Sequence, residues 1–287
     1  MKLAFVRLLE TLVMILGTST LAAGQAYRWV DDSDSDSDEP LPMDLSWLPD
    51  RPEGPSTGRA TFRAHRKNYL LLSYDDRFQA PERDGELKFQ ISMRSNLFEV
   101  DRDKRIVGAY TNRSFWQIMQ ESKPFRTTDH EPELFFEWDL RDEEMQVRAG
   151  YIHLSNGEDG SDSRRLDRYF AEALRYWGQT DSGSLRGGLR LWLRGPIDKQ
   201  NNPDIRDYYG IGDLRCDYMW RGKHRRLISA VIRPARRGAV ELNFSLAPFH
   251  KAPEFRVLCQ YYNGYGESIH AYDVNSNRIS FGLELSP

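Results

Sequence analysis

The feature that most constrains this sequence is a repeated alternation of hydrophobic and polar residues with a period of two. Successive side chains of a β-strand point to opposite faces, so this alternation predicts strands with one apolar and one polar face. Segments with a helical period are rare after residue 67, and turn sequences rich in Gly, Asn and Asp separate the alternating ones. The clearest alternating segments are 85–93, 132–140, 187–195, 238–249 and 277–287.

The alternating segments predict about twelve strands with no helices between them. Parallel strands need long crossover connections that usually contain a helix, so the predicted sheet is antiparallel. A sheet of this size must also remove its two exposed edges, and closure into a barrel does so. The predicted strands lie near residues 67–75, 86–95, 105–118, 133–140, 144–155, 163–176, 184–194, 206–220, 225–233, 237–247, 254–262 and 276–285.

The two faces of the predicted strands indicate which closed sheet to expect. The polar face carries large charged residues such as Arg190, Arg194 and Glu241, while the apolar face is broad. The chain has 7 Trp, 14 Tyr and 14 Phe residues, which suit the aromatic girdles at two membrane interfaces. We therefore expect an all-β fold, a twelve-stranded antiparallel transmembrane β-barrel of the bacterial outer membrane, apolar outside and polar inside. A soluble β-sandwich is the alternative.

The N-terminal part of the chain predicts export and a three-part organisation. Residues 1–24 have early basic residues, an apolar stretch and then small residues, which is typical of a secretory signal peptide. An N-terminal core helix is the alternative. Residues 25–65 are rich in Asp, Ser, Pro and Gly, so they are expected to form a flexible acidic arm. Residues 66–287 are expected to form the barrel.

Charge and cysteine usage narrow the range of partners. The net charge is -3, and the 40 Lys and Arg residues are dispersed along the chain, so no nucleic-acid partner is expected. The two cysteines, Cys216 and Cys259, fit no metal-binding spacing. We expect them to be unlinked, with a disulfide as the alternative.

One stretch combines residue types that are typical of nucleophilic catalysis. His153 and Ser155 lie two residues apart in GYIHLSNGEDGSDSRRLDRY, residues 150–169. Residues i and i+2 of a strand share one face, and Gln146 and Arg148 take the polar face of this strand. His153 and Ser155 are therefore expected on the outer, bilayer-facing side, where a polar pair is costly unless it has a function.

The turn after this strand is expected to bring an acidic residue to the same place. A hairpin centred on Gly160 sets His153 opposite Asp167, with Cβ atoms roughly 4.5–5.5 Å apart. Ser155, His153 and Asp167 would then follow the order of a nucleophile, a base and an orienting acid. The alternative is a His and a Ser at an interfacial strand end, hydrogen-bonded to neighbours or to lipid headgroups.

The turn itself is rich in oxygen ligands. Glu158, Asp159, Asp162 and Ser163 offer the carboxylate, carbonyl and hydroxyl oxygens that Ca²⁺ prefers. The spacing is not that of an EF-hand, and a solvated acidic turn is the alternative.

Six sequence motifs, SFWQ, SKPFRTTDHEPELF, GYIHLSNG, SRRLDR, NNPDI and YNGYGES, occur in one order between about Asn68 and Leu285. In this order they resemble the outer membrane phospholipase A family, the bacterial phospholipase A1 or phosphatidylcholine 1-acylhydrolase. The resemblance implies a twelve-stranded barrel that hydrolyses membrane phospholipids with phospholipase A1, phospholipase A2 and lysophospholipase activity. It further implies Ca²⁺ as cofactor and a homodimer as the active form.

The resemblance also assigns the catalytic groups. By motif match it implies that Ser155 is the nucleophile and His153 the base. Asp167 stands where the family usually has Asn, which gives this chain a Ser-His-Asp triad. We expect the backbone N–H of Gly157 to stabilise the tetrahedral oxyanion together with Ca²⁺.

For the metal site, the resemblance implies four ligands: Ser122, the backbone carbonyl of Glu158, Ser163 and Asn201. Three positions depart from the family pattern. Asn201 replaces an acidic residue, Glu158 replaces an Arg, and Gly160 replaces an Asp.

These inferences together predict a calcium-dependent serine hydrolase of the outer membrane. The alternative is a catalytically impaired structural or porin-like barrel, which the substitutions at Glu158, Asp167 and Asn201 favour. A wide pore is not expected, because large residues such as Arg190 and Trp192 are predicted to face the lumen.

Overall fold

The computed structural model describes residues 62–75, 85–140, 144–177, 183–195, 201–220, 225–249, 252 and 255–285. The predicted signal peptide and residues 25–61 of the predicted arm lie outside this part of the chain. Within it, no helix has both the length and the apolar character needed to span a bilayer.

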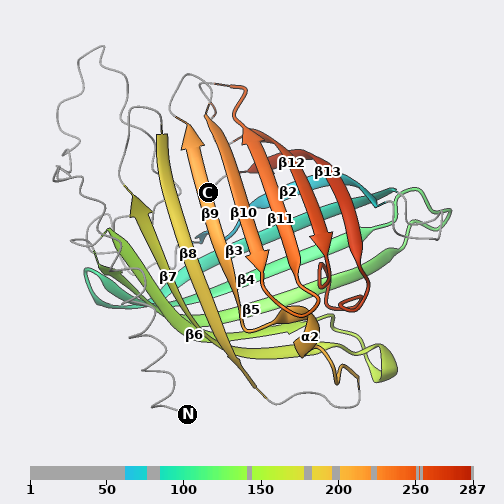
Figure 1. Cartoon of the computed structure of the whole chain (residues 1–287), viewed down its shortest axis with the longest axis horizontal. Coiled ribbons are helices and arrows are strands. Elements are labelled where there is room, and N and C mark those ends of the chain that lie inside the picture. Colours follow the sequence, from blue (N-terminus) through green and yellow to red (C-terminus); the bar gives the residue numbers. More distant parts are fainter. Residues whose placement is uncertain are drawn as a thin grey trace.

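The sheet is a closed barrel of twelve long antiparallel strands (Figure 1). Each strand pairs with its neighbours in sequence, and the last pairs back with the first, so the sheet has no free edge. This architecture confirms the predicted fold class. The strands are β2 (Asn68–Asp75), β3 (Gly85–Asp101), β4 (Lys104–Trp116), β5 (Phe125–Leu140), β6 (Met145–Ser155), β7 (Arg165–Trp177), β8 (Gly183–Arg194), β9 (Gly212–Trp220), β10 (Arg226–Arg233), β11 (Ala239–Leu246), β12 (Phe255–Gly264) and β13 (Ser276–Leu285).

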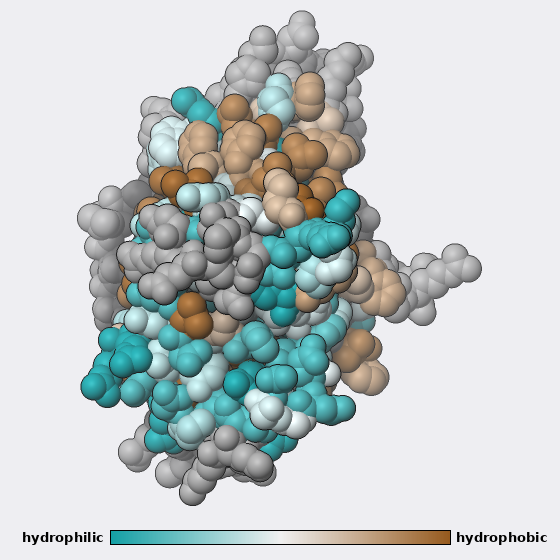
Figure 2. Space-filling model, turned by 90° about the vertical axis from the view of Figure 1, so that its right-hand side faces the viewer, coloured by the Kyte–Doolittle hydropathy of each residue, from teal (hydrophilic) through white to brown (hydrophobic). Residues whose placement is uncertain are grey.

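The outer face of the barrel is apolar, as the alternation predicts. On β13, Ile279, Phe281 and Leu283 are exposed, while the polar residues Arg278, Ser280 and Glu284 that alternate with them are buried. The same pattern repeats on β3, β5, β8 and β11. Figure 2 shows hydrophobic side chains gathered on the upper part of one side, and hydrophilic ones at the end where α2 (Arg206–Tyr209) lies in Figure 1.

The inner face is polar and charged, and its side chains are buried against one another. Arg278 is fully buried and contacts three carboxylates, those of Asp75, Glu86 and Glu267. Buried charges are tolerable only when they are paired in this way. Aromatic side chains share the lumen, and Trp192 packs there among buried apolar residues.

Four elements differ from the sequence prediction. β3 runs on to Asp101, beyond its predicted end near residue 95. β5 begins at Phe125, well before residue 133, because its first half carries polar outward residues and Pro132, which hide the alternation. The strand predicted over 206–220 begins with the short helix α2 instead. A two-residue strand, β1 (Arg63–Ala64), pairs with β3 although it lies within the predicted arm, so strand pairing starts before residue 66.

Cys216 and Cys259 are not linked to each other, as expected. Each lies on a different strand of the barrel wall, β9 and β12, and both are exposed.

One end of the lumen is filled by an apolar cluster. The cluster joins the ends of β6 and β7 to α2 and to the segment between β12 and β13, which lie together at the bottom of Figure 1. The hairpin between β6 and β7 is therefore packed against the buried side chains of this cluster. The buried members are Leu154, Leu166, Ile205, Tyr208, Tyr209, Ile269 and Tyr272.

Candidate active site

The β6–β7 hairpin pairs His153 directly with Asp167, as the predicted centre at Gly160 requires. His153 Nδ1 lies 2.7 Å from Asp167 Oδ1, a distance typical of a charge-assisted hydrogen bond. The structure therefore brings together the predicted base and the predicted orienting acid. With Nδ1 bonded to the carboxylate, His153 Nε2 is the nitrogen left to accept a proton.

The pair lies on the outside of the barrel. Ile152 and Leu154, which flank His153, are buried in the lumen clusters, so alternation turns His153 and Ser155 outward. The His153 side chain is 36% exposed and that of Asp167 is 16% exposed. A substrate can thus reach the pair from the outer surface of the barrel wall.

Asp167 has a second partner that the sequence did not indicate. Tyr151, two residues before His153 on the same face, donates its hydroxyl to Asp167 Oδ1 at 2.5 Å. One carboxylate oxygen therefore accepts from both side chains, which fixes the orientation of the acid. The Tyr151 ring also contacts the Tyr169 ring, with centroids 5.4 Å apart.

The predicted nucleophile is next to the base but not bonded to it. Among the residues that the structure describes, Ser155 Oγ has no hydrogen-bond partner, His153 included. The two side chains share one face at positions i and i+2. Contacts between a nucleophile and its base are often loose without substrate, so this arrangement is compatible with catalysis.

The loop between β6 and β7 is organised by Asn156, a residue to which sequence reasoning gave no role. Its side-chain oxygen accepts from the backbone N–H of Arg164 at 2.9 Å, and its amide donates to the Asp162 carbonyl at 2.7 Å. Asn156 is 4% exposed. Its place directly before a glycine is a turn signal that could have identified it.

Two glycines give this loop its path. Gly157 has a φ of 72° and Gly160 a φ of 61°, values that other residues adopt only at a cost. Gly157 follows Ser155 by two residues, and the oxyanion role of its N–H stays a prediction.

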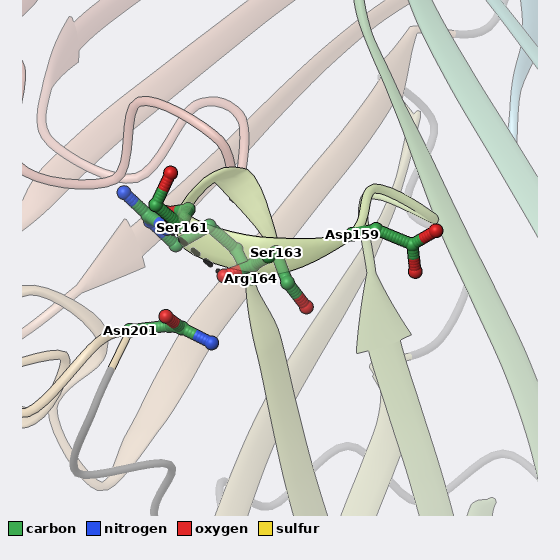
Figure 3. Close-up of a pocket in the computed structure, with 6 residues that line it drawn as sticks. Asp159, Ser161, Ser163, Arg164 and Asn201 are labelled. Carbon is green, nitrogen blue, oxygen red and sulfur yellow. Dashed lines mark hydrogen bonds between the residues drawn. The ribbon is translucent and has the colours of Figure 1, made fainter.

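A second loop approaches the turn and forms an open pocket of about 590 Å³ with it (Figure 3). Ser163 comes from the β6–β7 loop and Asn201 from the segment before α2. Asn202 joins the two loops, because its side chain accepts from the Arg165 N–H at 3.3 Å and donates to the Arg165 carbonyl at 3.0 Å. Two of the four predicted calcium ligands, Ser163 and Asn201, therefore line one pocket.

The other two predicted ligands do not line this pocket. Ser122 lies exposed in the loop between β4 and β5, and Glu158 is exposed one residue before the pocket wall begins at Asp159. Figure 3 shows the Asp159 carboxylate pointing away from Ser163 and Asn201.

The pocket offers hydroxyl, amide and carbonyl oxygens, which are ligand types that Ca²⁺ prefers. Arg164 Nη1 donates to the carbonyls of Ser161 at 2.6 Å and Ser163 at 2.9 Å, so both oxygens already accept from a positive charge that lines the pocket. Hydroxyl and amide oxygens lie beside them. The described residues contain no group of three or more His, Cys, Asp or Glu side chains that could hold a metal. Ca²⁺ binding would therefore use hydroxyl, amide and carbonyl oxygens.

Two tyrosines of the apolar cluster form hydrogen bonds that hold the neighbouring loops in place. Tyr272 Oη donates to Asp204 at 2.6 Å, and Tyr209 Oη donates to the Gly266 carbonyl at 3.3 Å. Burial, followed by the hydrogen bond to Asp204, raises the pKa of Tyr272. Burial raises the pKa of Tyr209 to about 12. Both hydroxyls thus remain protonated donors at neutral pH and hold the segment that carries Asn201.

Residues 50–285 match the family model of phospholipase A1. A putative phospholipase A1 of Neisseria meningitidis serogroup B is 32% identical over 221 residues, which make up 70% of this chain and 55% of that protein. The phospholipase A1 of Klebsiella pneumoniae is 33% identical over 247 residues, or 79% of this chain and 78% of that protein. This chain therefore spans about half of the first relative and over three quarters of the second.

Two solved structures share the barrel. Outer membrane phospholipase A from Escherichia coli superposes with a TM-score of 0.68 and 26% identity, covering 79% of this chain and 98% of that one. The Salmonella typhi outer membrane phospholipase, solved as a dimer with bound calcium, gives a TM-score of 0.67 and 26% identity, covering 79% of this chain and 92% of that one.

Proposed function

This chain belongs to the phospholipase A1 family, and from that premise we propose that it hydrolyses the acyl ester bonds of membrane phospholipids. The observation that carries the proposal is the 2.7 Å contact between His153 and Asp167 on the outer barrel wall, beside Ser155. The proposed activities are phospholipase A1, phospholipase A2 and lysophospholipase.

The proposed reaction proceeds through an acyl-enzyme. Ser155 Oγ attacks the ester carbonyl carbon while His153 Nε2 takes its proton, and the carbonyl π electrons move onto oxygen. When these electrons return, the ester C–O bond breaks and the leaving alkoxide takes the proton from His153. Water then attacks the acyl group, His153 accepts a proton from it, and the fatty acid leaves as Ser155 Oγ regains its proton. Asp167 stabilises the imidazolium form of His153 during both steps.

The oxyanion is stabilised by the backbone N–H of Gly157 in this proposal. When Ca²⁺ is bound, it supplies positive charge that stabilises the same developing oxyanion. Ser163 and Asn201 are the residues of the pocket that would hold it, and Ser122 and the Glu158 carbonyl complete the proposed ligand set. The calcium-bound relative from Salmonella typhi supports this proposal.

The outward orientation of the site has two consequences for the substrate. A phospholipid can reach Ser155 laterally from the bilayer, without entering the lumen. We propose that two chains associate through their apolar outer faces near the site, so that acyl chains lie in the groove between them. The dimeric relative supports this arrangement.

The proposed location is the bacterial outer membrane. The apolar outer face and the membership of the family support it. Residues 1–24 would act as the signal peptide for export, and removal of these residues from the mature chain is the expected result of N-terminal sequencing.

The function is tested by hydrolysis of phospholipid in detergent mixed micelles by the refolded full chain. We expect fatty acid release with Ca²⁺ and none with a chelator. Substrates labelled separately in each acyl chain assign the position of cleavage. Ser163→Ala should raise the Ca²⁺ concentration that gives half of the maximal rate. A refolded protein that releases no fatty acid with Ca²⁺ would contradict the proposal.

The porin-like alternative receives little support from the lumen. Arg190 and Trp192 are each 3% exposed, and the described inward side chains are buried in ion pairs and aromatic contacts. We therefore expect no large steady current when the protein is inserted into a planar bilayer. A stable pore conductance would favour the alternative.

A further inference from the structure

A second histidine, His130 of β5, lies beside the proposed nucleophile. His130 pairs directly with Ser155 across β5 and β6, so the two side chains share the outer face. A Cβ atom built on Gly157 would lie 3.4 Å from His130 Cδ2 and 3.5 Å from His130 Nε2. The Cδ2–Nε2 edge of the ring therefore borders the same space as Ser155 and the Gly157 backbone.

Contacts on the other edge of the ring determine where its proton lies. Tyr110 Oη is 2.6 Å from His130 Nδ1, and the two rings stack with an interplanar angle of 28°. Asn112 Nδ2 lies 3.5 Å from the same nitrogen, and Ser114 Oγ donates to Asn112 Oδ1, which turns the amide N–H group toward the ring. The Asn112 amide nitrogen can only donate, and the Tyr110 hydroxyl can donate as well, so these contacts favour Nδ1 as the acceptor and Nε2 as the nitrogen that carries the proton.

The hydrogen-bond partners of His153 and His130 differ in charge and therefore point to different roles for the two side chains. His153 bonds to the Asp167 carboxylate, which stabilises the cation that a base becomes. His130 bonds to a phenol and an amide, which supply no negative charge. His130 is therefore suited to donate from Nε2 and not to act as the base. Within the described part of the chain, His130 Nε2 has no hydrogen-bond partner.

We propose that the Nε2–H group of His130 donates a hydrogen bond to the carbonyl oxygen of the scissile ester, alongside the Gly157 N–H. This inference rests on the proposed function and adds a residue that contacts the substrate. As Ser155 Oγ bonds to the carbonyl carbon, negative charge develops on the oxygen and the hydrogen bond strengthens. No proton leaves His130 during the reaction.

The test compares His130→Phe, which keeps a stacking ring without the donor, with His130→Gln, which keeps a donor near the position of Nε2. Loss of one oxyanion donor costs about a hundredfold in kcat, so His130→Phe should fall by that amount. His130→Gln should stay within about tenfold of the wild-type protein. Neither variant should change the Ca²⁺ concentration for half of the maximal rate.

Two further comparisons keep the result unambiguous. Tyr110→Phe removes the main donor to His130 Nδ1 and should lower kcat, whereas Tyr261→Phe, which removes a hydroxyl bonded to Asn277 on β13, should not. If His130→Phe does not fold, His130→Glu replaces it, since it puts an acceptor where His130→Gln has a donor. His130→Glu should then lose at least a hundredfold in kcat.

Three results would overturn the inference. These are a fully active His130→Phe, an equal loss in His130→Phe and His130→Gln, and a His153→Phe variant that stays active while His130→Phe does not. The last result would make His130 the base. Wild-type protein and Ser155→Ala are measured alongside. An inactive wild type overturns the proposed function and this inference with it, whereas an active wild type with an active His130→Phe overturns this inference alone.

Discussion

At the scale of single residues, Asp167 is the orienting acid of the proposed triad, at a position where the resemblance to the family implies Asn. Asp167 Oδ1 accepts from both His153 and Tyr151, and an Asn side chain could accept both bonds with its own oxygen. The structure therefore gives a geometric reason why either residue can hold His153. The difference between them is the negative charge.

Asp167→Asn should lower kcat by about fivefold. A hydrogen bond to a charged acceptor contributes about 1 kcal/mol more than one to a neutral acceptor, and each 1.36 kcal/mol is a factor of ten. Asp167→Ala removes the acceptor and should cost at least about a hundredfold. Steady-state kinetics on mixed micelles check both. Equal activity of Asp167→Ala and the wild type would remove Asp167 from the mechanism.

Tyr151→Phe should lower kcat roughly fivefold with little change in KM, because Asp167 loses one of the two hydrogen bonds that orient it. Tyr169→Phe is the matched control. The Tyr169 ring contacts the Tyr151 ring on the same face, but the described hydrogen bonds of Asp167 do not include Tyr169. An effect of Tyr169→Phe as large as that of Tyr151→Phe would mean that packing, and not the hydrogen bond, is what matters.

Some side-chain contacts at the candidate site could be predicted from the sequence, and others could not. The pairing of His153 with Asp167 could be predicted, because a hairpin centre and strand periodicity fix it. The contacts of Tyr151 and His130 could not. The first depends on the length of a phenol side chain, and the second depends on β5 beginning at Phe125, whereas the hydrophobic alternation predicts a strand only from about residue 133.

At the scale of elements, the β6–β7 loop serves two proposed purposes in nine residues, 156–164: it supplies the oxyanion donor and it lines the proposed calcium pocket. Its first half contains Gly157, whose N–H is the proposed oxyanion donor, and its second half lines the pocket with Ser163. The two halves are joined by the side chain of Asn156, which bonds to Asp162 and Arg164.

Two glycine variants test the oxyanion role and the calcium-binding role of this loop separately. An alanine at φ near +60° to +70° costs about 1–2 kcal/mol in either place, so the loop strain is matched. Gly157→Ala should lower kcat about tenfold at saturating Ca²⁺. Gly160→Ala, whose Cβ would meet nothing within 4 Å, should keep that rate and raise the Ca²⁺ needed. The test is to measure the hydrolysis rate of both variants as a function of Ca²⁺ concentration. Identical curves would contradict the assignment of different roles to the two halves of the loop.

The elements that sequence reasoning misjudged share a physical cause. The first half of β5 places Thr128 and His130 on the outer face, so hydrophobic alternation is lost there. The helix α2 has four residues, too few for a helical period to be read. In both cases, tertiary packing near the site determined the local structure.

At the scale of the whole molecule, the closed barrel could be predicted because alternation, strand number and the need to remove edges all agree. The identity of the ion pairs inside could not. Arg278 on β13 meets Glu86 on β3 and Glu267 on the segment between β12 and β13, a set brought together only by closure.

Arg278→Met should lower the free energy of unfolding by about 3–5 kcal/mol, because it removes the cation that three buried carboxylates share, although Glu86 keeps its ion pair with Arg126 and Glu267 keeps its ion pair with Lys88. Arg236→Met is the control. The Arg236 side chain is 77% exposed and pairs with Asp207 at the surface, so the change should stay below about 1 kcal/mol. Urea unfolding in detergent measures both. Equal effects would mean that the lumen ion pairs add little to stability.

The central claim is that Ser155, on the outer wall of the barrel, is the nucleophile of a phospholipase. Labelling with a long-chain sulfonyl fluoride, followed by mass spectrometry of the peptides, tests it most directly. We expect one label per chain, on Ser155, with a parallel loss of phospholipid hydrolysis, and neither label nor hydrolysis in Ser155→Ala. A label on another residue, or a Ser155→Ala protein that still releases fatty acid, would contradict the account.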